Sequence, residues 1–262
     1  MKDQTGRDVH IPRIPSRIVS VVPSQTELLF DLGLNDKIVG ITKFCVHPKE
    51  LVKTKEKIGG TKNLNLEKIR SLKPDLIIAN KEENKRSEIE LLMKEFPVWI
   101  SDVKTLDDAL EMIQAVGELT GRSEGAQKIS TTISNQFTDL QRLTSNVQPL
   151  PAAYLIWHRP MMTAGNDTFI NSMIEWCRFK NVFGERKRYP EITESELAEA
   201  SPKVILLSSE PFPFRQKHVD YYQGICPDAK ILLVDGQMFS WYGSRLRHAP
   251  GYFAELMHLS GE

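Results

Sequence analysis

Two stretches of this 262-residue chain carry the same pattern, and this internal repeat is the feature that most restricts its fold. Residues 65–78 read NLEKIRSLKPDLII, and residues 193–206 read TESELAEASPKVIL. Each copy contains a residue type that caps helices, a short helix, a proline and a buried strand. The prolines Pro74 and Pro202 are 128 positions apart. The repeat therefore predicts two related lobes.

Short apolar strands alternate with helices on both sides of the chain's midpoint. Strands are predicted at residues 17–22, 37–42, 75–79, 98–100, 153–157, 182–184, 204–208 and 231–234. Helices are predicted at residues 25–32, 65–72, 87–96, 106–119, 169–177, 193–200 and 250–259, the first of them capped by Ser24. This alternation favours mostly parallel sheets that are covered by helices on both faces.

A long polar stretch, residues 123–146, separates the two halves. Its apolar side chains recur every three or four positions, as expected for one stripe along a helix: Ala126, Ile129, Ile133, Phe137, Leu140 and Leu143. Such a helix would be about 35 Å long, and Pro149 and Pro151 prevent its continuation. We therefore predict an N-terminal lobe at 1–122, a linker helix at 123–147 and a C-terminal lobe at 148–262.

Composition excludes several classes of function. Lys plus Arg equals Asp plus Glu, at 34 each, so a nucleic-acid partner is not expected. No run of about 18 apolar residues is present to span a membrane. Cys45, Cys177 and Cys226 are widely spaced and form no CxxC pair, so neither a zinc ribbon nor a disulfide framework is indicated. The opening MKDQTGRDVHIPRIP is not a secretory signal peptide, which indicates a cytoplasmic protein or a mature chain without its leader.

The loops that follow the predicted strands are the candidate ligand site. In open parallel sheets, ligands bind beyond the carboxyl ends of the strands. The candidate ligand-binding residues on these loops are Phe44, Cys45, Thr61, Lys62, Asn80, Trp157, Arg159, Tyr189, Phe212, Trp241, Tyr242 and Arg245. The aromatic residues offer flat apolar walls for a large ligand. Trp157 and Phe239 could instead close the hydrophobic core beneath the loops.

The same loops carry no signature of catalysis. The motifs GxSxG, HExxH, GxxxxGK[ST] and GxGxxG are all absent. His47, His158 and His248 could converge on a metal together with Cys45 or Glu82, which leaves a metal-dependent enzyme or metal chaperone as an alternative. We predict a monomeric binding protein without catalytic residues, resident metal or cofactor.

Four stretches also resemble a known family. Residues 17–40 (RIVSVVPSQTELLFDLGLNDKIVG), 58–79, 162–184 and 235–245 (DGQMFSWYGSR) are similar to the helical-backbone, or class III, substrate-binding proteins of ABC importers. These proteins carry cobalamin, haem and iron–siderophores. The resemblance implies an α/β fold of two similar lobes joined by one long central helix, with ligand between the lobes and only small closure. It also implies a periplasmic or membrane-anchored extracytoplasmic protein; a cytoplasmic sensor of the same fold is an alternative.

The resemblance extends to ligand and partner. Residues 42–48 (TKFCVHP) resemble a loop of cobalamin-binding members, which favours a corrinoid. The alternative is a ferric siderophore or haem, for which Arg159, Arg188 and Arg245 are available. We expect the partner to be an ABC importer permease.

In this family a glutamate on each lobe docks to arginines of the permease. Glu67 occupies the first such position. The second position is Ser195, flanked by Glu194 and Glu196, so the chain departs from the family pattern there. Glu196 also has capping-box spacing from Thr193. We predict docking through Glu67 and through Glu194 or Glu196; the alternative is that these carboxylates only stabilise helix starts.

Overall fold

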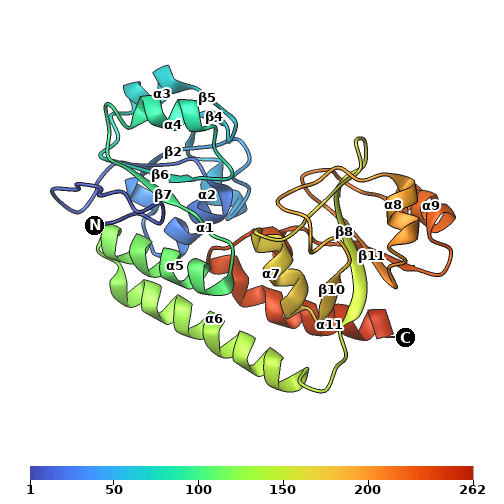
Figure 1. Cartoon of the computed structure of the whole chain (residues 1–262). Helices are drawn as coiled ribbons and strands as arrows, with labels where there is room; N and C mark the ends of the chain where they lie inside the picture. The colour runs from blue at the N-terminus through green and yellow to red at the C-terminus, as the bar shows by residue number, and fades with distance from the viewer. Residues whose placement is uncertain (262) are drawn as a thin grey trace. The chain divides into compact units, whose positions relative to one another are not determined.

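The computed structural model describes residues 1–261, which divide into two compact α/β units (Figure 1). The N-terminal unit comprises Met1–Val103, Asp107–Ile133 and Tyr242–Arg245. The C-terminal unit comprises Lys104–Leu106, Ser134–Trp241 and the chain from Leu246 onward. The prediction of two α/β lobes with mostly parallel sheets is confirmed.

The N-terminal unit is built on a five-stranded sheet of order β3-β2-β1-β6-β7, in which every pairing is parallel. The strands are β1 (Ile18–Ser20), β2 (Ile38–Ile41), β3 (Glu56–Lys57), β6 (Leu76–Asn80) and β7 (Val98–Ser101). A two-stranded hairpin pairs β4 (Gly59–Gly60) with β5 (Asn63–Leu64). The helices are α1 (Pro23–Asp31), η1 (Asn35–Lys37), α2 (Lys49–Val52), α3 (Leu66–Ser71), α4 (Arg86–Leu92) and α5 (Leu106–Thr120). All five residues of β6 are buried, as expected for the inner strand of a parallel sheet.

The C-terminal unit has a sheet of order β10-β8-β11-β12, also with parallel pairings, and a short strand β9 antiparallel to β8. The strands are β8 (Leu150–Trp157), β9 (Met162–Thr163), β10 (Phe179–Asn181), β11 (Val204–Ser208) and β12 (Lys230–Val234). The helices are α7 (Phe169–Trp176), α8 (Glu194–Glu199), α9 (Gln216–Ile225), α10 (Gln237–Ser240), η2 (Ser244–His248) and α11 (Ala249–Gly261). Its core combines the buried faces of β8 and β11 with Leu197 of α8 and Tyr222 of α9.

The internal repeat corresponds to a repeated structure. Strand order β2-β1-β6-β7 in one unit matches β10-β8-β11-β12 in the other. The capping residues Asn65 and Thr193 each accept a hydrogen bond from the backbone three residues on. Lys73 and Ser201, immediately before the two prolines, share the same left-handed φ of 46°. The similarity therefore extends to backbone conformation, which supports a duplicated lobe.

The predicted central helix is α6 (Ser123–Leu143), which is continuous and begins at the predicted residue. Its residues up to Ile133 pack with the N-terminal unit and those from Ser134 with the C-terminal unit. At its start, Ala126 lies so close to Gly117 of α5 that an added Cβ at Gly117 would be 2.3 Å from the Cβ of Ala126. In the C-terminal unit, Phe137 packs edge-on against Trp176 at 5.1 Å between ring centroids. None of the helices described is both long enough and apolar enough to cross a bilayer.

Two local predictions were wrong, and one helix was not predicted. Ser24 does not cap the first helix, because Pro23 already occupies its first position, where the missing N–H costs no hydrogen bond. The strand expected at 182–184 lies three residues earlier, at β10. Helix α9 was missed because its sequence, QKHVDYYQGI, buries only His218 and Tyr222 and so shows little apolar periodicity.

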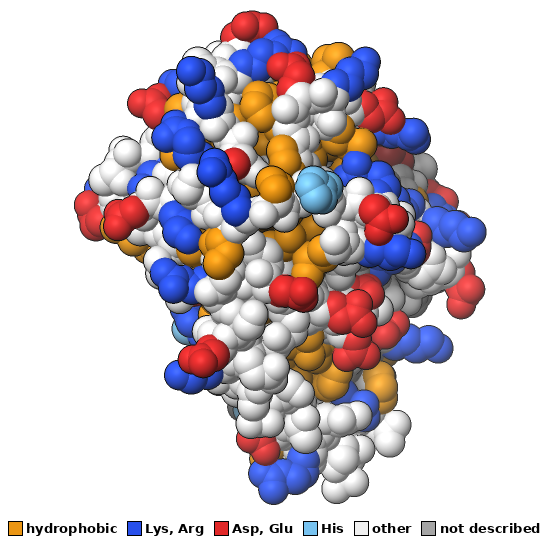
Figure 2. All heavy atoms as spheres, turned by 90° about the vertical axis from the view of Figure 1, so that its left-hand side faces the viewer, with side chains coloured by type: hydrophobic (Ala, Val, Ile, Leu, Met, Phe, Trp, Pro, Cys, Tyr) orange, Lys and Arg blue, Asp and Glu red, His pale blue; other side chains and the backbone are white. Residues whose placement is uncertain are grey.

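On the face drawn in Figure 2, basic and acidic side chains are interspersed, with apolar side chains between them. This mixture agrees with the equal totals of 34 basic and 34 acidic residues.

Candidate ligand-binding site

The loop after β2 places two neighbouring candidates in opposite environments. The Phe44 side chain is 52% exposed, whereas Cys45 is buried. The Cys45 thiol donates to Thr26 Oγ1 at 3.2 Å and lies 3.3 Å from Thr42 Oγ1. Burial raises the pKa of this thiol above its ordinary value. Cys45 therefore fixes the loop from within, and Phe44 is the surface that the loop presents.

The Phe44 ring rests on the β4–β5 hairpin because Gly60 has no side chain. A Cβ at Gly60 would be 3.1 Å from Cε2 of the ring, tighter than ordinary van der Waals contact. The Nζ of Lys43 lies 5.1 Å from the ring centroid and forms a cation–π contact with it. On the same hairpin, Thr61 is half-buried and Lys62 is exposed, with Lys62 Nζ donating to the carbonyl of Glu82.

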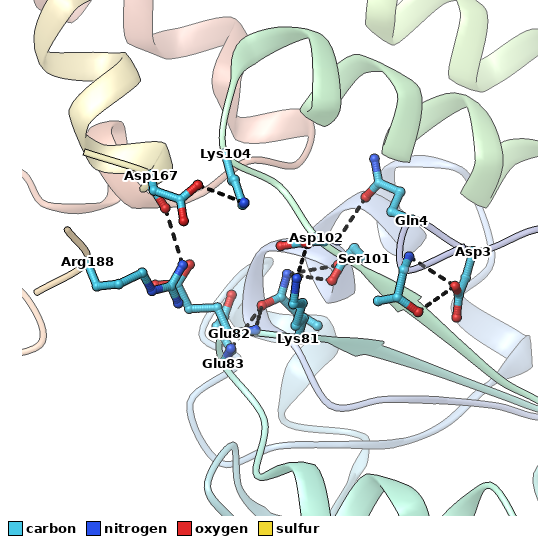
Figure 3. Close-up of polar contacts among 12 residues, drawn as sticks. Asp3, Gln4, Lys81, Glu82, Glu83, Ser101, Asp102, Lys104, Asp167 and Arg188 are labelled. Carbon is cyan, nitrogen blue, oxygen red and sulfur yellow. Dashed lines mark hydrogen bonds and ion pairs between the residues drawn. The ribbon is translucent and has the colours of Figure 1, made fainter. Parts of the chain in front are cut away.

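The loop after β6 is organised by Asn80, which is buried. Its Oδ1 accepts from the backbone N–H groups of Glu82 and Glu83 at 2.8 and 2.9 Å, and its Nδ2 donates to Ser101 Oγ at 3.0 Å. Next to it, Lys81 forms an ion pair with Asp102, whose backbone N–H donates to Gln4 (Figure 3). Asn80 therefore shapes the loop, and a ligand contact by its amide remains a prediction.

The segment Tyr242–Arg245 follows C-terminal-unit sequence but packs within the N-terminal unit. Arg245 donates two hydrogen bonds to the Glu27 carboxylate, at 2.8 and 2.7 Å, and the two side chains are only 15% and 10% exposed. The Tyr242 hydroxyl donates to Glu83. A Cβ at Gly243 would lie 2.4 Å from the carbonyl oxygen of Ser24, so only glycine fits there. Tyr242 and Arg245 hold this segment in place, and their predicted ligand contacts remain untested.

In the C-terminal unit, the loops after β8 and β11 bring three candidates together. Trp157 is 37% exposed and meets Phe212 edge-on, with 5.6 Å between ring centroids. The indole N–H of Trp157 donates to the carbonyl of Arg159 at 3.0 Å, and the Arg159 side chain is exposed. These loops therefore form an exposed aromatic surface with a cation beside it.

Trp241 and Tyr189 are less accessible. Trp241 is only 6% exposed, and its indole N–H donates to Glu210 Oε1 at 3.0 Å. Tyr189 is half-buried, with the guanidinium of Arg188 5.9 Å from its ring centroid. Arg188 also donates to the carbonyl of Asp167, and the Asp167 carboxylate pairs with Lys104 at 2.7 Å (Figure 3).

A histidine pair lies behind the exposed aromatic surface. The rings of His158 and His218 are 5.0 Å apart at their centroids, and burial lowers the pKa of both. His218 Nδ1 accepts from the backbone N–H of Arg215, so its proton lies on Nε2 in the neutral form. Within residues 1–261, no group of three or more His, Cys, Asp or Glu side chains is arranged to hold a metal ion.

Comparison with known proteins decides the family. Residues 18–220 match the family model described as "Periplasmic binding protein". The chain belongs to this family. It is 30% identical over 222 residues, 78% of this chain and 67% of the relative, to the uncharacterized ABC transporter substrate-binding lipoprotein YvrC of Bacillus subtilis. It is 28% identical over 194 residues, 73% of this chain and 70% of the relative, to the vitamin B12-binding protein of Vibrio cholerae.

The fold agrees with this assignment. The crystal structure of the periplasmic vitamin B12-binding protein BtuF of Vibrio cholerae superposes with a TM-score of 0.83 at 23% identity, covering 96% of this chain and 100% of that one. By family and fold, the chain is therefore a class III substrate-binding protein of an ABC importer, and a binding protein rather than an enzyme.

The predicted docking glutamates differ in how they are held. Glu67, at the start of α3, has a side chain 87% exposed and pairs with Arg70 at 2.6 Å. Glu194, at the start of α8, is also exposed and accepts from the Tyr221 hydroxyl. Glu196 is engaged on several sides, because it completes the predicted capping box with Thr193 and pairs with Arg186 at 2.6 Å. Glu194 is thus better placed than Glu196 to meet a partner.

Sequence reasoning missed the partners of these side chains. Glu27, Glu210 and Tyr221 were not among the candidates, although they hold Arg245, Trp241 and Glu194 respectively. The adjacent Tyr221 and Tyr222 stand out in the sequence as an aromatic pair, but nothing in their spacing indicates that Tyr221 contacts Glu194.

The protonation state of Glu196 provides a test of the capping box. The Arg186 hydrogen bond, and then those from Thr193, lower the pKa of Glu196 to about 2. Its stabilisation of α8 should be fully present above the ordinary glutamate value of about 4.3 and be lost as the pH falls toward 2. Hydrogen exchange of α8 amides between pH 5 and about 2 measures this. We expect Glu196→Gln to remove that pH dependence and Glu199→Gln to retain it; identical profiles for all three proteins would contradict the assignment.

Proposed function

We propose that this protein captures cobalamin or another corrinoid outside the cytoplasm and delivers it to an ABC importer. The observation that carries the proposal is the edge-to-face pair formed by the exposed Trp157 and the half-buried Phe212 at the carboxyl ends of β8 and β11. A corrinoid is a large ring with apolar faces, which suits such walls. The similarity to a vitamin B12-binding protein supports the same ligand class.

The candidate contacts within each unit have different roles in this proposal. Phe44 in the N-terminal unit and Trp157 with Phe212 in the C-terminal unit supply apolar surface. Thr61, Lys62, Arg159 and Tyr189 supply polar groups that orient the ligand. Cys45 and Asn80 act by holding their loops in shape, because both are buried.

The central helix supports a mechanism with little movement. Helix α6 contains no proline, and its single glycine, Gly125, lies at its third residue. Sharp kinks in helices arise mainly at proline, at glycine or at helical bulges. We therefore propose that ligand is taken up with small closure, as the resemblance implies.

A ferric siderophore or haem is the second candidate ligand. The observation that favours it is the set of cations at the same strand ends, where Lys43, Lys62 and Arg159 are exposed. An anionic chelate would be attracted by these charges, whereas cyanocobalamin carries little net charge. Parallel binding tests with haemin and ferric enterobactin, both anionic, separate this candidate from the first.

Isothermal titration with cyanocobalamin tests the proposal. We expect 1:1 binding, and we expect the double variant Trp157→Ala/Phe212→Ala to weaken it about tenfold or more, since buried aromatic anchors dominate binding energy. Leu143→Ala, which also truncates an exposed apolar side chain but on α6, is the matched control and should change the affinity less than about twofold. Absence of heat together with absence of co-eluting red ligand would overturn the corrinoid assignment.

A further inference from the structure

The hydroxyl of Tyr221 connects a predicted ligand contact with a predicted docking residue inside the C-terminal unit. Tyr221 lies on α9, which packs beside α8 (Figure 1). Its hydroxyl donates a hydrogen bond to Oε1 of Glu194 on α8. Arg159, from the loop after β8, acts on the same phenol by lowering its pKa. Tyr221 therefore contacts Glu194 and is also sensitive to Arg159.

The Tyr221 ring is held in a defined orientation. It meets His158 and Tyr222 edge-on, with centroid separations of 5.0 and 5.1 Å and an interplanar angle of 88° in each case. Tyr222 is fully buried and its hydroxyl lies 3.0 Å from His158 Nδ1. His158 follows β8 directly, so the ring is fixed against the loop that carries Arg159. Such edge-to-face packing restricts the phenol more than burial alone would.

The two charged neighbours act on Tyr221 in opposite directions. The hydrogen bond to Glu194 is the main cause that raises the pKa of Tyr221, and Arg159 lowers it. The ionisation of this phenol therefore reports the presence of each neighbour. A carboxylate that accepts one hydrogen bond from a phenol retains acceptor capacity for a permease arginine.

We propose that Tyr221 is a positioning residue that orients the docking carboxylate of Glu194 and couples it to ligand binding at Arg159. The inference rests on the proposed function, which places ligand at Arg159 and the permease at Glu194. When Arg159 turns toward a polar group of the ligand, its charge moves away from Tyr221. The hydroxyl then interacts with Glu194 alone, so the carboxylate offered to the permease differs between the empty and the loaded protein.

Titration of tyrosines labelled with ¹³C at Cζ tests the contacts without any ligand. Glu194→Gln should lower the pKa of Tyr221, and Arg159→Gln should raise it. Tyr222→Phe serves as the matched control, because it removes the neighbouring hydroxyl, which lies against His158 rather than Glu194. If neither charged variant shifts the titration of Tyr221, the proposal is overturned.

The coupling is tested by repeating the titration with the chelate that binds among cyanocobalamin, haemin and ferric enterobactin. Bound chelate should raise the pKa of Tyr221 in the wild type and leave it unchanged in Arg159→Gln; an unchanged wild type overturns the coupling. Docking to the cognate importer in proteoliposomes should weaken about threefold to tenfold in Tyr221→Phe, with Tyr222→Phe near wild type. Equal docking of Tyr221→Phe and wild type overturns the positioning role. If none of the three chelates binds, the proposed function fails, while the ligand-free titrations still decide the contacts of Tyr221.

Discussion

Replacement of Arg245 by methionine is expected to destabilise the N-terminal unit by about 3 kcal/mol. Arg245 donates two hydrogen bonds to Glu27, and both side chains are largely removed from water. Methionine fills similar space but leaves the Glu27 carboxylate without its counter-charge, and an uncompensated charge in a poorly solvated position is costly. Hydrogen exchange of α1 amides, together with urea unfolding followed by circular dichroism, measures the loss.

Two variants show whether the loss of stability comes from the uncompensated charge of Glu27. Arg245→Met/Glu27→Leu removes both charges and should recover most of the lost stability, because replacing a buried ion pair by apolar groups is often neutral or favourable. Arg142→Met breaks an exposed pair with Asp139 on α6 and should cost less than about 0.5 kcal/mol. A loss below about 1 kcal/mol in Arg245→Met would show that the pair contributes little and that Gly243 or Tyr242 holds the segment instead.

The contrast between α3 and Arg245 shows what the sequence could predict. The helix start at Asn65 was predicted correctly because a cap depends on residues only three positions apart. Several strand ends, such as those of β8, β11 and β12, were also predicted correctly, since short apolar runs bounded by polar residues are local patterns. Arg245 and Glu27 are separated by 218 positions, and no local pattern records such a pairing. The sequence could therefore suggest a ligand contact for Arg245, which stays a prediction, but not its pairing with Glu27.

The two tryptophans show that the burial of a side chain also could not be predicted from the sequence. Trp157 ends β8, Trp241 lies on the segment between β12 and the end of the chain, and both suit an aromatic wall. In the structure Trp157 is 37% exposed, whereas Trp241 is 6% exposed and hydrogen-bonded to Glu210. The difference depends on which loop covers each indole, which is a property of the tertiary fold. Candidate residues at strand ends can thus be found from sequence, but their accessibility cannot.

Reversal of charge at both predicted docking positions, Glu67→Lys/Glu194→Lys, is expected to lower importer-dependent ligand delivery at least about a hundredfold. Glu67 and Glu194 are exposed in the first turns of α3 and α8, the two helices related by the internal repeat. A lysine facing a permease arginine replaces attraction by repulsion, and like charges in an interface cost several kcal/mol. Two such contacts together exceed the roughly 2.7 kcal/mol that corresponds to a factor of a hundred.

The decisive measurement is ligand-stimulated ATPase activity of the cognate importer in proteoliposomes, with ligand affinity measured in parallel. The double variant should retain ligand affinity within about twofold, because neither glutamate lies on a strand-end loop of the candidate site. Glu50→Lys/Glu199→Lys reverses two other exposed glutamates, one in each unit, and controls for the change in net charge. Equal activity of the two double variants would mean that overall charge, and not these two helix starts, governs docking. Loss of activity in Glu196→Gln instead of Glu194→Gln would transfer the second docking position to the residue that also caps α8.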